Sequence, residues 1–149
     1  MDTVIAAVPR EPLACWRLFT DVALLGAWVP GLRRAQVLAK ERGLPSEVHF
    51  EFATDLAYTL VYTYDLEALE VTWHPKLGAR DAVSGFARFA RSADGTTALT
   101  YGLEHGAGRD AGERALGDLR ELVTALSAWL VARIPPPPLA TAPSLTARD

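Results

Sequence analysis

The chain has 149 residues, half of them hydrophobic, and a formal net charge of -3 at pH 7. This length predicts one domain with a hydrophobic core of its own. The small negative charge argues against nucleic acid as the main partner, because phosphate binding needs a basic surface. No apolar run approaches the ~20 residues of a membrane-spanning helix, and the single cysteine, Cys15, cannot form an internal disulfide. We therefore expect a cytoplasmic protein without a membrane span.

The first thirty residues predict one strand and two short helices. Residues 3–8 form a β-branched and alanine run that is typical of a strand. Pro12 fits the first turn of a helix that carries Trp16 and Phe19 on one face. Asp21 can cap a second short helix, which a Pro-Gly pair ends.

From residue 33 onward the hydrophobic pattern has a period of two, which predicts strands. Short connections, among them the hairpin signal Asp94-Gly95, favour antiparallel pairing of these strands. With the first strand they make about seven, expected at residues 33–42, 46–54, 58–65, 69–74, 82–91 and 97–105.

Residues 110–133 predict one long amphipathic helix. Asp110 can cap its first turn, and Pro135 cannot continue it. Because the wide apolar face must be buried, we expect the sheet to receive it, which makes an α+β domain of residues 1–134. The proline-rich residues 135–149 are predicted to be disordered. The apolar face is formed by Leu116, Leu119, Val123, Leu126 and Leu130, with Leu122 and Trp129 beside them.

Several segments carry a resemblance to a known family: the first strand entering Val8-Pro9, residues 13–21, the Trp28-Val-Pro-Gly31 segment, the strand at 85–89, and Asp94-Gly95-Thr96. Together with the C-terminal helix, they resemble the START-like superfamily, also called SRPBCC, Bet v 1-like or polyketide cyclase/dehydrase, over about residues 3–133. The resemblance implies a helix-grip fold, in which a curved antiparallel sheet wraps the long C-terminal helix and leaves an apolar cavity. It implies no universal catalytic motif.

If the apolar strand faces point inward, they form the wall of that cavity. Such a wall offers apolar area and a few hydroxyl donors, which suit a hydrophobic ligand with few oxygen atoms. For any one of these residues, ordinary core packing is the alternative. The predicted ligand-binding residues are Phe50, Phe52, Tyr58, Leu60, Tyr62, Trp73, Phe89, Leu99, Tyr101 and Leu103 from strands, and Leu119, Val123 and Leu126 from the helix.

The candidate catalytic residues are His105, Tyr101 and Tyr62. By side-chain alternation, His105 lies on the same strand face as Tyr101. It could act as a general base at the cavity mouth, because imidazole titrates near neutrality. The alternative is a histidine that faces water at the end of a strand. His49 and His74 share faces with glutamates and threonines, so we expect them to be solvated. No metal-ligand spacing is present, and we expect neither a metal nor a cofactor.

Three functional hypotheses follow. The first is a binding protein that holds a hydrophobic small molecule, such as a lipid, a quinone or a polyketide-like compound, in the cavity. The second is a polyketide cyclase/dehydrase-type enzyme that uses cavity tyrosines and His105. The third is a protein-interaction domain that acts through a sheet edge or the proline tail, and an interior packed shut with side chains would favour it.

Overall fold

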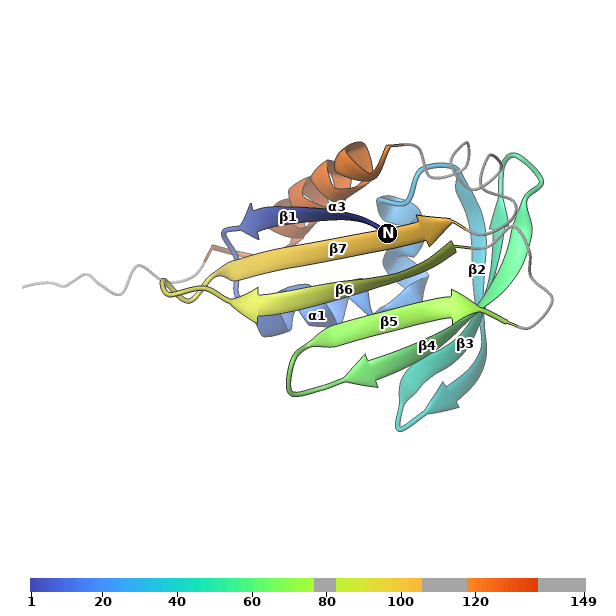
Figure 1. Ribbon diagram of the computed structural model, residues 1–149, viewed down its shortest axis with the longest axis horizontal. Coiled ribbons are helices and arrows are strands. Elements are labelled where there is room, and N and C mark those ends of the chain that lie inside the picture. The colour runs from blue at the N-terminus through green and yellow to red at the C-terminus, as the bar shows by residue number, and fades with distance from the viewer. Residues whose placement is uncertain (77–82, 106–117, 137–149) are drawn as a thin grey trace, which may run out of the picture.

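The computed structural model describes residues 1–76, 83–105 and 118–136. In this part of the chain, one antiparallel sheet carries the helical segments on its inner face (Figure 1). The helical segments are α1 (Pro12–Phe19), the 3-10 helix η1 (Val22–Ala27) and α3 (Leu119–Arg133). The strands are β1 (Asp2–Val8), β2 (Leu32–Glu41), β3 (Leu44–Phe52), β4 (Ala57–Asp65), β5 (Glu70–Pro75), β6 (Val83–Arg91) and β7 (Thr97–His105).

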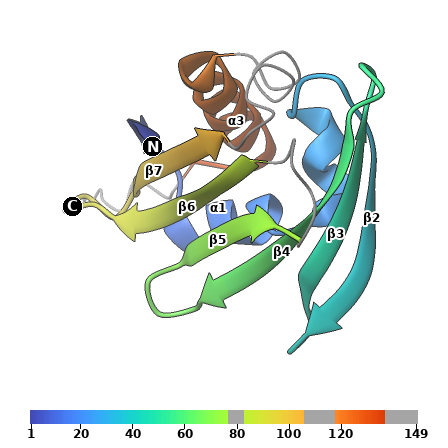
Figure 2. The same ribbon diagram turned by 45° about the vertical axis from the view of Figure 1, so that its right-hand side comes forward.

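The strands follow the order β1-β7-β6-β5-β4-β3-β2, and every neighbouring pair is antiparallel. The sheet bends around the helical segments, and β2 and β3 stand at a steep angle to β6 and β7 (Figure 2). This arrangement confirms the predicted α+β helix-grip fold. No helix in the described ranges is long and apolar enough to cross a membrane.

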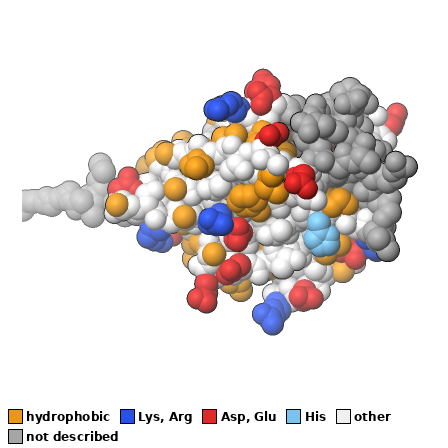
Figure 3. All heavy atoms as spheres, in the orientation of Figure 1, with side chains coloured by type: hydrophobic (Ala, Val, Ile, Leu, Met, Phe, Trp, Pro, Cys, Tyr) orange, Lys and Arg blue, Asp and Glu red, His pale blue; other side chains and the backbone are white. Residues whose placement is uncertain are grey.

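Side-chain alternation assigns each strand an inner and an outer face. On β3, Val48, Phe50 and Phe52 are buried, whereas His49 and Glu51 are partly exposed on the other face. On the outer face, which Figure 3 shows, charged and hydrophobic side chains are mixed. This mixture is typical of a sheet with one solvated side.

Phe86 interrupts the inward pattern of β6 because it packs on the outer face. A Cβ atom at Gly102, its partner on β7, would lie 2.5 Å from the Phe86 ring and 3.0 Å from the sulfur of Met1. The glycine therefore leaves the space in which the Phe86 ring lies. This pairing explains why an aromatic residue is found on the solvent side of the sheet.

The C-terminal helix is shorter than its sequence pattern predicts. Asp118 has an extended backbone (φ -72°, ψ 135°), and its carboxylate accepts a hydrogen bond from the Arg120 amide at 3.0 Å. The helix therefore begins at Leu119 with Asp118 as its N-cap, and the prediction of one continuous helix over 110–133 is wrong. The predicted turns up to residue 117, with Leu116 and the cap Asp110, lie outside the described residues.

Arg10 fastens the C-terminal end of α3 to the connection between β1 and α1. Its Nε donates to the Ile134 carbonyl at 2.6 Å, and its Nη2 donates to the Val131 carbonyl at 3.0 Å. The last carbonyls of a helix have no partner within it, and the helix dipole favours a cation there. The Arg10 carbonyl in turn accepts a hydrogen bond from the buried Thr97 hydroxyl at 2.8 Å. One residue thus joins α3, β7 and the β1–α1 connection.

We predict that Arg10→Ala lowers the free energy of unfolding by about 1–3 kcal/mol, because two partly buried carbonyls lose a charged donor. Urea denaturation measures the change. Lys40→Ala is the control: Lys40 is exposed, no polar contact of its side chain is found within the described ranges, and a change within about 0.5 kcal/mol is expected. Equal losses in both variants would contradict the prediction.

Candidate ligand-binding cavity

A cavity lies between the inner face of the sheet and the helical segments. Its volume, counted as the space open to the centres of water molecules, is about 60 Å³. One water needs about 10–15 Å³ in this measure, so the cavity has room for a few waters or one small ring. A long lipid chain fits only if side chains move. Among the described residues, the lining consists of Phe19, Leu25, Trp28, Val29, Phe50, Phe52, Tyr58, Leu60, Tyr62, Trp73, Val83, Tyr101, Leu103 and Leu122.

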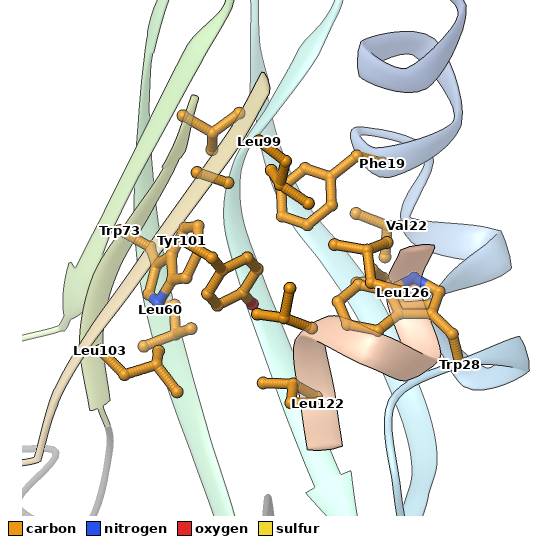
Figure 4. Close-up of a cluster of buried hydrophobic side chains, with 14 of the residues drawn as sticks. Phe19, Val22, Trp28, Leu60, Trp73, Leu99, Tyr101, Leu103, Leu122 and Leu126 are labelled. Carbon is orange, nitrogen blue, oxygen red and sulfur yellow. The ribbon is translucent and has the colours of Figure 1, made fainter. Parts of the chain in front are cut away.

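Aromatic rings form most of the cavity wall, as Figure 4 shows in part. Phe19, at the end of α1, packs against Trp28 at a ring-centroid distance of 5.8 Å. It also packs against Trp73 and Tyr101, both at 6.1 Å. Trp73 stacks on Tyr62 at 6.0 Å with an interplanar angle of 30°. The wall therefore presents ring faces and edges, which suit a flat apolar ligand.

Trp73 lies close against the sheet because its cross-strand neighbour is a glycine. Trp73 on β5 pairs with Gly85 on β6. A Cβ atom at position 85 would clash with the backbone carbonyl oxygen of Gly102 and would lie 2.8 Å from Cζ2 of the Trp73 ring and 2.9 Å from Cδ2 of Leu103. A side chain at position 85 would therefore strain the β6–β7 pairing and press on the indole. Gly85 fixes the position of this part of the wall.

The polar atoms of the described lining are tyrosine hydroxyls and indole N–H groups, and no charged side chain contributes to it. Burial raises the pKa of Tyr58, Tyr62 and Tyr101 well above the ordinary value of 10.0, and the neighbouring tyrosines add to the rise at Tyr62. These hydroxyls are therefore neutral at physiological pH. They can donate or accept hydrogen bonds to a ligand oxygen, but they are poor bases.

The indole nitrogen of Trp28 is a fully buried polar atom of this wall. Nε1 is buried, and no partner for it is found within the described ranges. A buried donor without an acceptor costs about 1–3 kcal/mol, so its position is determined by the packing of the ring rather than by its polar group. The ring itself is held between Phe19 and the cavity.

The structure brings many of the predicted ligand-binding residues to this cavity, but not all of them. Phe89 and Leu99 are buried nearer α1, where Phe89 packs against Trp16 and Phe19. Val123 lies on the side of α3 that faces β1. Leu119 and Leu126 also belong to the packed core rather than to the cavity lining. The predicted residues that line the cavity are Phe50, Phe52, Tyr58, Leu60, Tyr62, Trp73, Tyr101 and Leu103.

Sequence reasoning missed six lining residues. The sequence pattern puts Phe19 on a helix face but does not indicate the cavity. It puts Leu122 beside the main apolar stripe of the C-terminal helix. Leu25, Trp28 and Val29 come from η1 and the residues after it, where a short 3-10 helix gives little periodic signal. Their proximity to the Pro30-Gly31 turn was the available signal, because that segment carried the family resemblance. The sixth residue is Val83, the first residue of β6.

The three histidines occupy different positions. The ring of His49 lies on the outer face of β3, with Nδ1 3.0 Å from the Thr59 hydroxyl and Nε2 3.4 Å from the Glu51 carboxylate. His74 is exposed on β5. His105 is the last residue of β7 and pairs with Val83, but its side chain lies outside the description. Within the described ranges, no cluster of three or more residues could hold a metal ion.

Comparison with solved structures places this fold among START-like proteins. A START superfamily protein from Mycobacterium smegmatis matches with a TM-score of 0.68 and 16% identity, over 87% of this chain and 95% of that chain. The Zhui aromatase/cyclase from Streptomyces sp. R1128 matches with a TM-score of 0.69 and 15% identity, over 89% and 93%. Ara h 8.0201 matches with a TM-score of 0.62 and 12% identity, over 89% and 97%.

These likenesses confirm the START-like helix-grip fold that the sequence predicts. No protein-family model matches the sequence, and no curated protein matches it. At identities of 12–16%, similarity of structure shows that the fold is shared but does not show that the activity is shared. The function must therefore be argued from the cavity.

We predict that Gly85→Ala lowers the free energy of unfolding by about 1–3 kcal/mol, because the added methyl group meets the Gly102 carbonyl and overpacks the wall against Trp73. The tryptophan fluorescence of the folded protein should also shift, because the indole moves. Gly26→Ala is the matched control, since a Cβ atom there meets nothing within 4 Å. Gly26→Ala should be neutral or stabilising by up to about 1 kcal/mol. The explanation fails if the two substitutions have the same effect.

We predict that the four tyrosines stay protonated in the native protein at pH 10, where a free tyrosine is half ionised, because burial raises the pKa of Tyr58, Tyr62, Tyr64 and Tyr101. The unfolded chain loses these protons near pH 10, so the stability that these tyrosines contribute is complete well below pH 10 and falls as the pH rises above it. Absorbance at 295 nm and chemical denaturation measured from pH 8 to 11 test both statements. Tyrosinate absorbance in the folded protein at pH 10 would contradict them.

Proposed function

We propose that this protein binds a small, flat hydrophobic molecule that carries at least one oxygen atom. The lining of the cavity supports the proposal: ring faces dominate it, three neutral tyrosine hydroxyls interrupt it, and charged side chains are missing from its described part. Apolar area supplies affinity, and a few hydroxyls orient the ligand. We propose that the lining residues predicted from the sequence, from Phe50 to Leu103, contact this ligand.

The size of the cavity narrows the class of ligand. A volume of about 60 Å³ suits a single-ring compound better than a lipid chain or a fused-ring polyketide. Among the ligand classes that the sequence suggests, a quinone-like compound is therefore the best match, and phenol is a simple probe of the same ring size. The similarity to START-like structures, among them an aromatase/cyclase, supports a cavity-based function. A cytoplasmic location stays a prediction.

An enzyme of the polyketide cyclase/dehydrase type is the second candidate. Hydroxyls of Tyr62 and Tyr101 could polarise a carbonyl oxygen, and catalysis would then need a separate base. His105 is the candidate for it, because its backbone pairs with Val83, which lines the cavity. A protein-interaction domain has less support, because it predicts an interior packed shut and the structure retains a cavity.

We predict saturable binding of both phenol and toluene, which have the same number of heavy atoms and differ in one hydroxyl. Tyr101→Phe should weaken phenol binding about 2- to 12-fold, as expected for one lost hydrogen bond, and leave toluene binding unchanged. Isothermal titration calorimetry measures both affinities. Absence of saturable binding for both compounds would reject the proposed function.

A second pair of variants tests whether the internal cavity is the site. Leu60→Phe adds volume to the wall and should weaken both compounds by about tenfold or more. Leu38→Phe is the matched control, because Leu38 on β2 is 49% exposed and does not line the cavity. Its affinities should equal those of the parent protein. Equal weakening in both variants would place the binding site elsewhere.

A further inference from the structure

β3 and β4 separate before the end of either strand. They pair over Glu47–Glu51 and Ala57–Val61 and no further. β4 continues to Asp65 and remains paired with β5 over that length. Figure 2 shows the end of β4 turning away from the beginning of β3. The sheet is therefore split between residues 44–46 of β3 and residues 62–64 of β4.

A pocket occupies this split. It has a volume of about 120 Å³ in the measure used for the internal cavity. Tyr62 lines this pocket and also lines the internal cavity, so its side chain stands between the two spaces. The pocket is lined by Glu41, Arg42, Leu44, Ser46, Tyr62, Thr63, Tyr64 and Leu66.

Aromatic stacking and one hydrogen bond keep the two spaces apart. On the cavity side, Tyr62 stacks on Trp73 at a centroid distance of 6.0 Å, and on the other side it meets Tyr64 at 6.2 Å. The Tyr64 hydroxyl crosses the split and donates to the Pro45 carbonyl at 2.5 Å. No backbone pairing of β3 with β4 is found here. Opening the split therefore requires side-chain rotation and the loss of one hydrogen bond rather than the breaking of a strand ladder.

The two spaces differ in chemistry. The described cavity lining is apolar, largely aromatic and uncharged, whereas the residues around the pocket in the split include Ser46 and the exposed Thr63, which carry hydroxyl groups. The pocket also contains one carboxylate, Glu41, and one guanidinium, Arg42. These opposite charges balance, so the pocket favours neither an anion nor a cation. A neutral group that both donates and accepts hydrogen bonds matches it best.

We infer that the split between β3 and β4 is a second subsite of the cavity, and that it binds the neutral polar end of an elongated amphiphile such as a primary alcohol. This inference rests on the proposed function and extends it: the internal cavity alone suits a single ring, and only the cavity joined to the split has room for an elongated chain. The apolar body of the ligand lies among the rings, and its chain passes the position of Tyr62, whose ring swings aside. Ser46 and Thr63 then hydrogen-bond the hydroxyl group, and a chain too long for the cavity alone is accommodated.

The first test is a series of straight-chain primary alcohols from butanol to decanol, titrated against the tryptophan fluorescence of the protein. Each added methylene should raise affinity about fourfold while it is buried. The inference predicts that the increase continues through octanol, past the length that the cavity alone can hold. A plateau at butanol or pentanol would overturn it.

The second test compares two tyrosine truncations. Tyr62→Ala joins the two spaces. The ratio of the decanol affinity to the butanol affinity should therefore be about tenfold or more higher in this variant than in the parent protein. Tyr58→Ala is the matched control, because Tyr58 lines the cavity alone and its removal enlarges one space without joining it to the other. Equal chain-length dependence in the two variants would overturn the inference.

The third test reports on the polar end and does not require a truncated ring. Thr63→Val keeps the shape of the side chain and removes its hydroxyl, so decanol binding should weaken about 2- to 12-fold while phenol binding is unchanged. Decanoate and decylammonium should both bind more weakly than decanol. If phenol binds but Thr63→Val leaves decanol unaffected, the subsite is wrong and the proposed function stands. If phenol also fails to bind, the proposed function falls.

Discussion

The packing of Phe19 links the buried core near α1 to the wall of the cavity. Its ring lies 5.3 Å from Phe89, which belongs to the packed core near α1, and 6.1 Å from Tyr101, which lines the cavity. The ring also meets Trp28, so it connects the end of α1 to the segment that follows η1. Phe19 therefore contacts both the packed core and the cavity wall.

The sequence predicts the strands well because alternation is a local property. Thr97–His105 has the predicted bounds, and the other strands differ by a few residues at their ends. The C-terminal helix shows the limit of this reasoning. Its hydrophobic period continues through Leu116 and Leu119, but the Asp118 carboxylate hydrogen-bonds the Arg120 amide and starts the helix there. The pattern Asp118-Leu-Arg-Glu121 is a capping signal, and the longer apolar period obscured it.

The cavity itself is harder to predict than the sheet. Side-chain alternation shows which face of the sheet a residue is on, but not whether that part of the face borders the cavity. Leu99 and Tyr101 share the inner face of β7, yet Tyr101 lines the cavity and Leu99 is fully buried outside its lining. The same holds on α3, where Leu122 reaches the cavity and Val123 faces β1. Which residue of a helical stripe is nearest a cavity depends on the rotation of the helix about its axis. That rotation is set by contacts distant in sequence, such as those from Arg10 to the end of α3.

The state of the tyrosines limits what this cavity can do chemically. A hydroxyl whose pKa is raised by burial stays protonated, so Tyr62 and Tyr101 can stabilise a developing charge on a ligand oxygen but are poor proton acceptors. Proton abstraction would need a base, and the described lining contributes no carboxylate, amine or imidazole. The same apolar rings that raise these pKa values also supply the area for binding. Burial of these hydroxyls therefore supports the proposed binding function over acid–base chemistry by the described lining.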